Sequence, residues 1–145
     1  MNIDILSLIF RYVHIVSAVL AVGGTSFIAL CLTPAMRLVD TSFRDSVLEM
    51  VQRRFTVVLW ASIAGLLVSG TYNWMKLNSA YTEVGPVAHA LIGIKFLLAL
   101  VMFGFVWARH IGLLKLSLKA HLMIVVHIAA IVILLGSILR ALRLG

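Results

Sequence analysis

The stretch ILSLIFRYVHIVSAVLAVGGTSFIALCLT (residues 5–33) contains one Arg and one His, and no Asp, Glu or Lys. An α-helix needs about 20 such residues to cross a hydrocarbon layer about 30 Å thick. Three further apolar runs of similar length follow, at about 55–77, 87–108 and 120–140. None alternates strictly between apolar and polar residues, as the strands of a membrane barrel do. We therefore expect the backbone N–H and C=O groups to form their hydrogen bonds within helices. The sequence therefore predicts an all-α integral membrane four-helix bundle with up-down-up-down topology.

The composition excludes most soluble activities. The chain has 145 residues, of which 63% are hydrophobic and 12% charged, and its mean hydropathy is +1.14. A soluble domain of this size could not cover so much apolar surface, so we expect one membrane domain over residues 1–145, with the lipid bilayer as its first partner. All five carboxylates lie in terminal or connecting segments, and no phosphate-binding glycine motif or Cys-x-x-Cys is present. Hydrolase, nucleotide and carboxylate proton-relay chemistry are therefore not expected.

The basic residues predict the orientation of the helices. Seven cations lie in the two connections that would share one face, and four on the opposite face. The seven are Arg37, Arg44, Arg53, Arg54, Arg109, Lys115 and Lys119, and the four are Arg11, Lys76, Arg140 and Arg143. Because cytoplasmic connections carry the excess of Lys and Arg, we expect a multi-pass protein of the cell membrane with both termini outside, in the periplasm. These charges suit anionic lipid headgroups rather than nucleic acid.

The connections between the apolar runs carry their own signals. Pro34 is expected to close the first helix and Pro86 to open the third, because proline has a fixed φ and no N–H. Between them, apolar residues spaced four apart predict an amphipathic interfacial segment over about 39–54. The stretch LNSAYTEVG (77–85) is expected to form a short outer connection.

A ridge of small residues in the second run, Ala61, Gly65 and Ser69, predicts close helix packing. The neighbouring surface could belong to the same bundle or to another subunit, including a second copy of the chain. The sequence leaves both alternatives open.

His14 is the first candidate site residue. It begins a face of small residues, Ser17, Ala21 and Gly24, which would leave room for a flat or bulky group beside the ring. A neutral imidazole in that position could ligate haem iron or copper. Alternatively, the ring is held by a hydrogen bond to a carbonyl across the bundle.

Lys95 is the only charged residue well inside a predicted span. Without a buried acid to pair with, its ammonium would need an anion brought by a cofactor, such as a haem propionate, or would extend toward the outer interface. On the fourth run, His127 lies one turn from Met123 and near the depth of Met102, which suggests a soft metal site if the methionines are more than core filler. His89 lies near the depth of His14 and could pair with it or face interfacial water.

Three segments resemble the copper-resistance protein D family. HIVSAVLAVGGTSFIALCLTPAMR (14–37) resembles its first helix, with an early histidine, paired glycines, and a proline and a basic residue at the inner end. RRFTVVLWASIAGLLVSGTYNW (53–74) resembles the second helix, and IGIKFLLALVMF (92–103) the third, where a lysine precedes a leucine run. The resemblance covers most of the chain and weakens in the fourth run.

The same four-helix plan is similar to that of the HemJ-type protoporphyrinogen oxidases. That resemblance implies haem b, bound with the help of a first-helix histidine and a third-helix lysine, the places that His14 and Lys95 occupy here. The chain departs from the HemJ pattern after the paired glycines, where TSFIAL replaces an aromatic-rich stretch, and at Gly93, where that family has a histidine. Whether the protein is an enzyme therefore stays open, and an oxidoreductase is the expected class if it is.

Three functions follow as hypotheses. The first is a haem b protein of membrane electron transfer, with His14 as one axial ligand, His89 or His127 as the other, and Lys95 beside a propionate. The second is copper transport or delivery across the membrane. Its ligands would be drawn from His14, His127, Met102, Met123 and Cys31. The third is a non-catalytic accessory subunit that docks on a larger membrane redox complex or partner protein.

Overall fold

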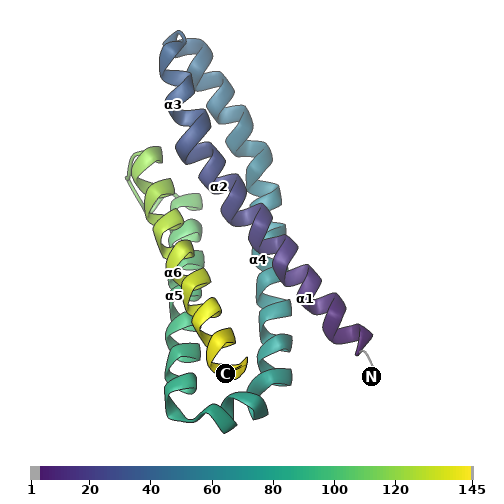
Figure 1. The fold of residues 1–145 in the computed structure, drawn as a ribbon. Helices are drawn as coiled ribbons and strands as arrows, with labels where there is room; N and C mark the ends of the chain where they lie inside the picture. The colour runs from purple at the N-terminus through teal and green to yellow at the C-terminus, as the bar shows by residue number, and fades with distance from the viewer. Residues whose placement is uncertain (1–3, 145) are drawn as a thin grey trace. The chain divides into compact units, whose positions relative to one another are not determined.

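The computed structural model describes residues 4–144, and of residues 80, 143 and 144 it describes the backbone alone. In the described residues, all regular secondary structure is helical and there is no strand (Figure 1). Four segments are long and apolar enough to cross a membrane: Ile5–Leu38, Thr41–Ser79, Pro86–His110 and Leu118–Leu142. The predicted all-α class and the four membrane helices are confirmed, and the chain is a multi-pass membrane protein.

The helices fall into two compact units, divided between Asn73 and Trp74. We call the unit before this division the first hairpin and the unit after it the second hairpin, and each is described by itself. The prediction of a single domain over 1–145 reaches beyond the described residues at both ends and stays a prediction.

The first hairpin begins with one continuous helical run. It comprises α1 (Ile5–Ala18), η1 (Val19–Gly23), α2 (Gly24–Phe27), η2 (Ile28–Leu32), α3 (Thr33–Ala35) and η3 (Met36–Leu38). Asp4 caps its start, where the carboxylate accepts hydrogen bonds from the Ser7 amide at 3.2 Å and the Ser7 hydroxyl at 2.8 Å. The two five-residue segments η1 and η2 are π-helical turns, and η3 is a closing 3₁₀ turn.

Pro34 does not close the first helix, contrary to the expectation from sequence. The helix continues through it to Leu38, and the backbone becomes extended only at Val39 (φ −117°, ψ 156°). The wide π turn η2 lies directly before Thr33–Pro34, and the Thr33 hydroxyl donates to the Ile28 carbonyl at 2.7 Å. A wider turn with a side-chain donor accommodates a ring that has no N–H, so the helix survives its proline.

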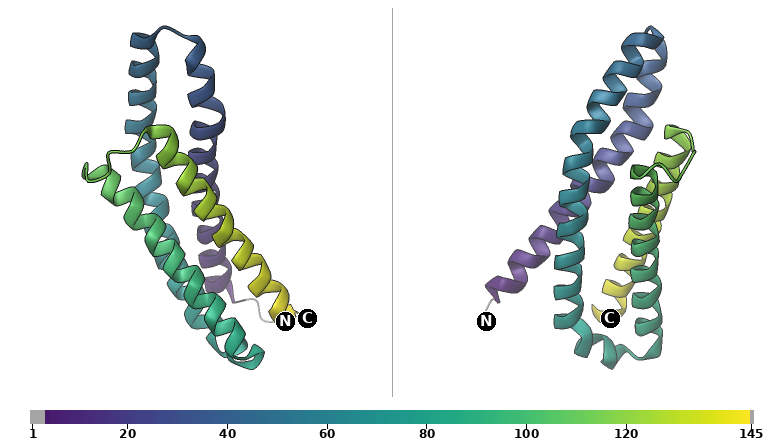
Figure 2. Two further views of the ribbon diagram at one scale, coloured as in Figure 1. Left: turned by 90° about the vertical axis from the view of Figure 1, so that its left-hand side faces the viewer. Right: turned by 180° about the vertical axis from the view of Figure 1, so that it is seen from behind.

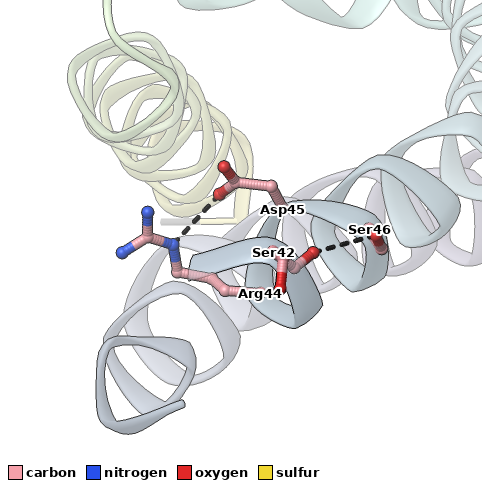
Figure 3. Close-up of polar contacts among 4 residues, drawn as sticks. All are labelled: Ser42, Arg44, Asp45 and Ser46. Atoms are coloured by element: carbon pink, nitrogen blue, oxygen red, sulfur yellow. Dashed lines mark hydrogen bonds and ion pairs between the residues drawn. The ribbon is translucent and has the colours of Figure 1, made fainter. Parts of the chain in front are cut away.

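The second long helix, α4, runs from Thr41 to Val84 without interruption. The predicted amphipathic segment is thus the first part of this helix. Its first turns carry only surface contacts: the Ser46 hydroxyl donates to the Ser42 carbonyl at 2.9 Å, and Arg44 Nε lies 3.1 Å from an Asp45 carboxylate oxygen (Figure 3). An exposed pair of this kind contributes little to stability.

At its other end α4 also differs from the expectation. The stretch expected to connect the second and third runs is helical as far as Val84, and Gly85 alone makes the connection with a φ of +98°. Only glycine adopts that conformation readily. Pro86 then opens α5 (Pro86–His110), as predicted.

The second hairpin consists mainly of α5 and α6 (Leu118–Leu144), which lie side by side and antiparallel (Figure 2). Helix α5 ends in a Schellman turn, in which Gly112 (φ +78°) bonds to Arg109 and Leu113 to Ala108. Ser117 starts α6, where its hydroxyl accepts from the Ala120 amide at 3.3 Å. The Arg109 guanidinium donates to the Leu116 carbonyl at 2.8 Å and ties the two ends of the turn together.

Candidate functional site

His14 lies at the contact between α1 and α4. Its Nδ1 is 2.9 Å from the hydroxyl oxygen of Ser69, a residue that is fully buried. The ring also lies beside Gly70, where an added Cβ would make an ordinary van der Waals contact of 3.5 Å with His14 Cε1. The ring itself is half-buried.

The partners of Ser69 fix which nitrogen of His14 carries the proton. The Ser69 hydroxyl donates to the Gly65 carbonyl, and a carbonyl oxygen only accepts. The single hydroxyl proton of Ser69 is therefore used, so Ser69 accepts from His14 and Nδ1 is the donor. In the neutral ring the lone pair then lies on Nε2, which is the arrangement of a metal-ligating histidine whose other nitrogen is hydrogen-bonded.

The small residues that follow His14 serve helix packing. A Cβ at Gly65 would overlap the Ser17 hydroxyl, and a Cβ at Gly24 would overlap the ring of Phe55. Ala21, between them, is buried. The expectation that this face leaves room for a flat group beside it is wrong, because α4 fills that space. The sequence left open whether the ridge of small residues packs within the chain or against another subunit. At Gly65 and Ser69 it packs within the chain, against α1.

Aromatic and hydroxyl groups stabilise the same contact toward the N-terminus of α1. The rings of Phe10 and Tyr72 stack with centroids 4.0 Å apart and planes 16° from parallel. The hydroxyls of Ser7 and Tyr72 lie 3.4 Å apart. Three contacts follow one another along the two helices: Phe10–Tyr72, His14–Ser69 and Ser17–Gly65. Their residue numbers rise along α1 while they fall along α4, so the two helices are antiparallel. His14 therefore lies in the middle of a series of helix–helix contacts.

Lys95 lies in the second hairpin, on the side of α5 that meets α6. A Cβ at Gly136 would be 3.2 Å from the Lys95 ammonium nitrogen. The Lys95 side chain therefore reaches across to α6 at Gly136, a residue without a side chain. Within residues 4–144 no hydrogen bond or ion pair joins Lys95 to another group. The chain has no Asp or Glu after Glu83, so no acid of α5 or α6 can neutralise it.

The other predicted ligands lie apart in their surroundings. His127 is exposed on α6, and its Nδ1 donates to the Met123 carbonyl at 2.6 Å, which again places the lone pair of the neutral ring on Nε2. Met102 is buried and Met123 half-buried, whereas His89 and Cys31 are exposed. In the described part of the chain, no three His, Cys, Asp or Glu side chains gather into a metal site.

The basic residues near His121 in the sequence suggest that it faces lipid headgroups, but the structure buries it, with 5% of its surface exposed. Its ring stacks on Phe105 of α5 with centroids 4.9 Å apart and planes 9° from parallel, and its Nδ1 is buried without a hydrogen-bond partner. The sequence could have indicated this contact through the spacing of the two residues. Phe105 and His121 lie at similar distances before and after the 111–117 turn, so they come opposite each other when the two helices pack antiparallel.

Haem fits the donor chemistry of His14 but not the face beside it. Nε2 of the neutral ring has the lone pair that iron requires, and the Ser69 hydrogen bond orients the ring. The Ser17–Gly24 face is closed by α4. A single imidazole with a fixed tautomer is thus the strongest candidate site in the first hairpin.

Comparisons of the chain with protein-family models, with curated proteins and with solved structures give no match.

Proposed function

We propose that the protein is a haem b protein of the membrane that takes part in electron transfer, in which His14 would ligate the iron. One observation supports this proposal most strongly: Ser69, whose own proton goes to the Gly65 carbonyl, accepts a hydrogen bond from His14 Nδ1. A histidine held in this way presents Nε2 in the form that binds iron.

The chain's own residues would set the properties of the site. Haem b, when bound, supplies a one-electron iron couple. Ser69 orients the imidazole and keeps its proton on Nδ1, and a hydrogen bond from that proton makes the ring a stronger donor. The tight contacts of α1 with α4 hold the ring in place against rotation. In the second hairpin, taken by itself, the Lys95 ammonium has no acid partner in α5 or α6 and would suit an anionic group beside it.

The test is an absorption spectrum of protein purified in mild detergent, oxidised and then reduced with dithionite. We expect a Soret band with a reduced α-band, and we expect both to be lost in His14→Gly. Added imidazole should restore the bands in His14→Gly, because it can occupy the space of the missing ring. If His14→Gly binds haem with an unchanged spectrum, His14 is not the ligand.

The same assay asks whether another histidine of the chain ligates the iron. His89→Ala and His127→Ala are compared with His110→Ala, which lies at the end of α5. A high-spin spectrum in only one of the first two variants assigns the ligand to that position. Unchanged spectra in all three indicate a ligand from outside this set.

The resemblance to the copper-resistance protein D family and to the HemJ-type oxidases motivates this proposal. With it we propose a location in the cell membrane with both termini outside, on the basis of seven cations against four. The test is a reporter that is active only in the cytoplasm, fused after residue 145. Activity of that reporter would contradict the proposed orientation. A partner protein or larger complex would supply and accept the electrons.

Copper transport or delivery is the second candidate, and His127 is the observation that favours it. Its Nδ1–H is anchored to the Met123 carbonyl and its neutral Nε2 can ligate copper. Metal analysis of the sample used for the spectrum separates the two: iron with porphyrin supports the first candidate, and copper without porphyrin the second. The absence of both, with migration as a large assembly, supports an accessory subunit.

A further inference from the structure

The turn between α5 and α6 gathers positive charge that the chain does not neutralise. Arg109, Lys115 and Lys119 lie within eleven residues, and the sequence from 84 to 145 contains no Asp or Glu. Both lysines are exposed and Arg109 is half-buried. The three cations therefore form a patch of positive charge that no acid of α5 or α6 offsets.

The turn holds these charges in a fixed arrangement. The Schellman bonds at Gly112 and Leu113, the hydrogen bond from Arg109 to the Leu116 carbonyl, and the Ser117 cap order the backbone from α5 into α6. An ordered turn loses less conformational entropy when it binds a ligand than a flexible one. The amides at the start of α6 add partial positive charge at the same end of the hairpin.

A second, independent feature at this end is the buried ring of His121, whose Nδ1 has no hydrogen-bond partner. A buried polar atom without a partner is costly, so it marks a place where a hydrogen-bonding group from outside the protein would be favoured. His121 follows Ser117 by one turn and contacts Phe105, so it belongs to the same end of α5 and α6 as the three cations.

We propose that the α5–α6 turn binds the phosphate of an anionic phospholipid through the positive charge of Arg109, Lys115 and Lys119. Both adjoining helices are membrane spans that end at this turn, so headgroup phosphates lie at its level. Trp107, exposed two residues before Arg109, is of the type that settles at the headgroup region. Charge and depth together select a lipid headgroup. The proposal is independent of haem.

Trp107 also provides the measurement. The chain has three tryptophans, so Trp60→Phe/Trp74→Phe leaves Trp107 as the only one, next to the site. We propose to compare the quenching of its fluorescence by brominated phosphatidylglycerol and brominated phosphatidylcholine in mixed bilayers. Quenching by the anionic lipid should be preferred, and each Lys or Arg near the surface should contribute about fivefold to that preference at low salt.

The variant Arg109→Gln/Lys115→Gln/Lys119→Gln should bring the preference close to one, and the matched control Arg11→Gln/Lys76→Gln should leave it unchanged. High salt should weaken the preference in the parent. His121→Phe, which keeps an aromatic ring against Phe105, should lower it less than the triple substitution.

Equal quenching by the two lipids in the parent, or an undiminished preference in the triple variant, overturns the proposal. Loss of the preference with inorganic phosphate at matched ionic strength shows a free-phosphate site and also overturns it. If the tryptophan substitutions prevent folding, the parent chain is used and the phosphatidylglycerol that co-purifies is measured by native mass spectrometry. There the triple variant should lose bound lipid and the control should retain it.

Discussion

The two hairpins treat their polar groups in opposite ways. In the first, His14 and Ser69 form a chain of hydrogen bonds that ends on the Gly65 carbonyl, inside a close helix contact. In the second, Lys95 and the Nδ1 of His121 have no hydrogen-bond partner among the described residues. The difference teaches that the first hairpin satisfies these polar groups by its own contacts, whereas the second leaves two polar groups without a partner in the described part of the chain.

The largest expected effect tests the tight contact of the first hairpin. Gly24→Val should destabilise the protein by about 1–3 kcal/mol, because its side chain would overlap the Phe55 ring. The control is the neighbouring Gly23→Val, where no atom lies within 4 Å of the added Cβ. Thermal unfolding in detergent measures both, and equal losses would show that α2 and α4 do not meet at Gly24.

The next effect has the opposite sign and concerns the second hairpin. Lys95→Met should stabilise ligand-free protein by about 1–3 kcal/mol, because it removes an unpaired ammonium from a membrane span. Lys115→Met, in the turn, should change stability little. The measurement is unfolding in a neutral detergent, and a loss of stability in Lys95→Met would reveal a partner for the lysine in the folded protein.

Ser69→Ala should destabilise the first hairpin by about 1 kcal/mol, because the His14 Nδ1 proton loses its acceptor. Ser137→Ala is the control, since that hydroxyl donates only to the Ile133 carbonyl of its own helix turn. Equal stability of the two variants would mean that the His14–Ser69 hydrogen bond contributes nothing to the fold.

The smallest effect is expected at His121. His121→Phe preserves an aromatic ring against Phe105 and removes the unpartnered nitrogen, so lipid-free protein should gain about 0.5–1 kcal/mol. Unfolding of the delipidated protein checks this gain. A clear loss would mean that His121 makes a hydrogen bond that stabilises the free protein.

The sequence predicted what depends on composition and local backbone chemistry. The four apolar runs fixed the class, and Pro86 opens α5 as its missing N–H requires. The sequence-based expectations for where the first and second long helices end were wrong. Pro34 is accommodated by the preceding π turn, and the stretch 77–84 is helical although it contains turn-forming residues.

The candidate site could be predicted only in part, because its contacts join residues far apart in sequence. His14 was singled out correctly as a polar group in an apolar helix, but its partner Ser69 follows only when the faces of α1 and α4 are known. The small residues after His14 gave the wrong expectation for the same reason, since their space is filled by Phe55 and the backbone at Gly65. His121 was missed because basic neighbours suggested an exposed position.

The central claim is that His14 offers Nε2 to haem iron. Its most direct test is the reduced-minus-oxidised spectrum of purified protein, His14→Gly, and His14→Gly with added imidazole. The account predicts Soret and α-bands in the first, their loss in the second and their return in the third. Haem bands that are unchanged in His14→Gly, or a parent protein that binds no haem even after reconstitution, would contradict it.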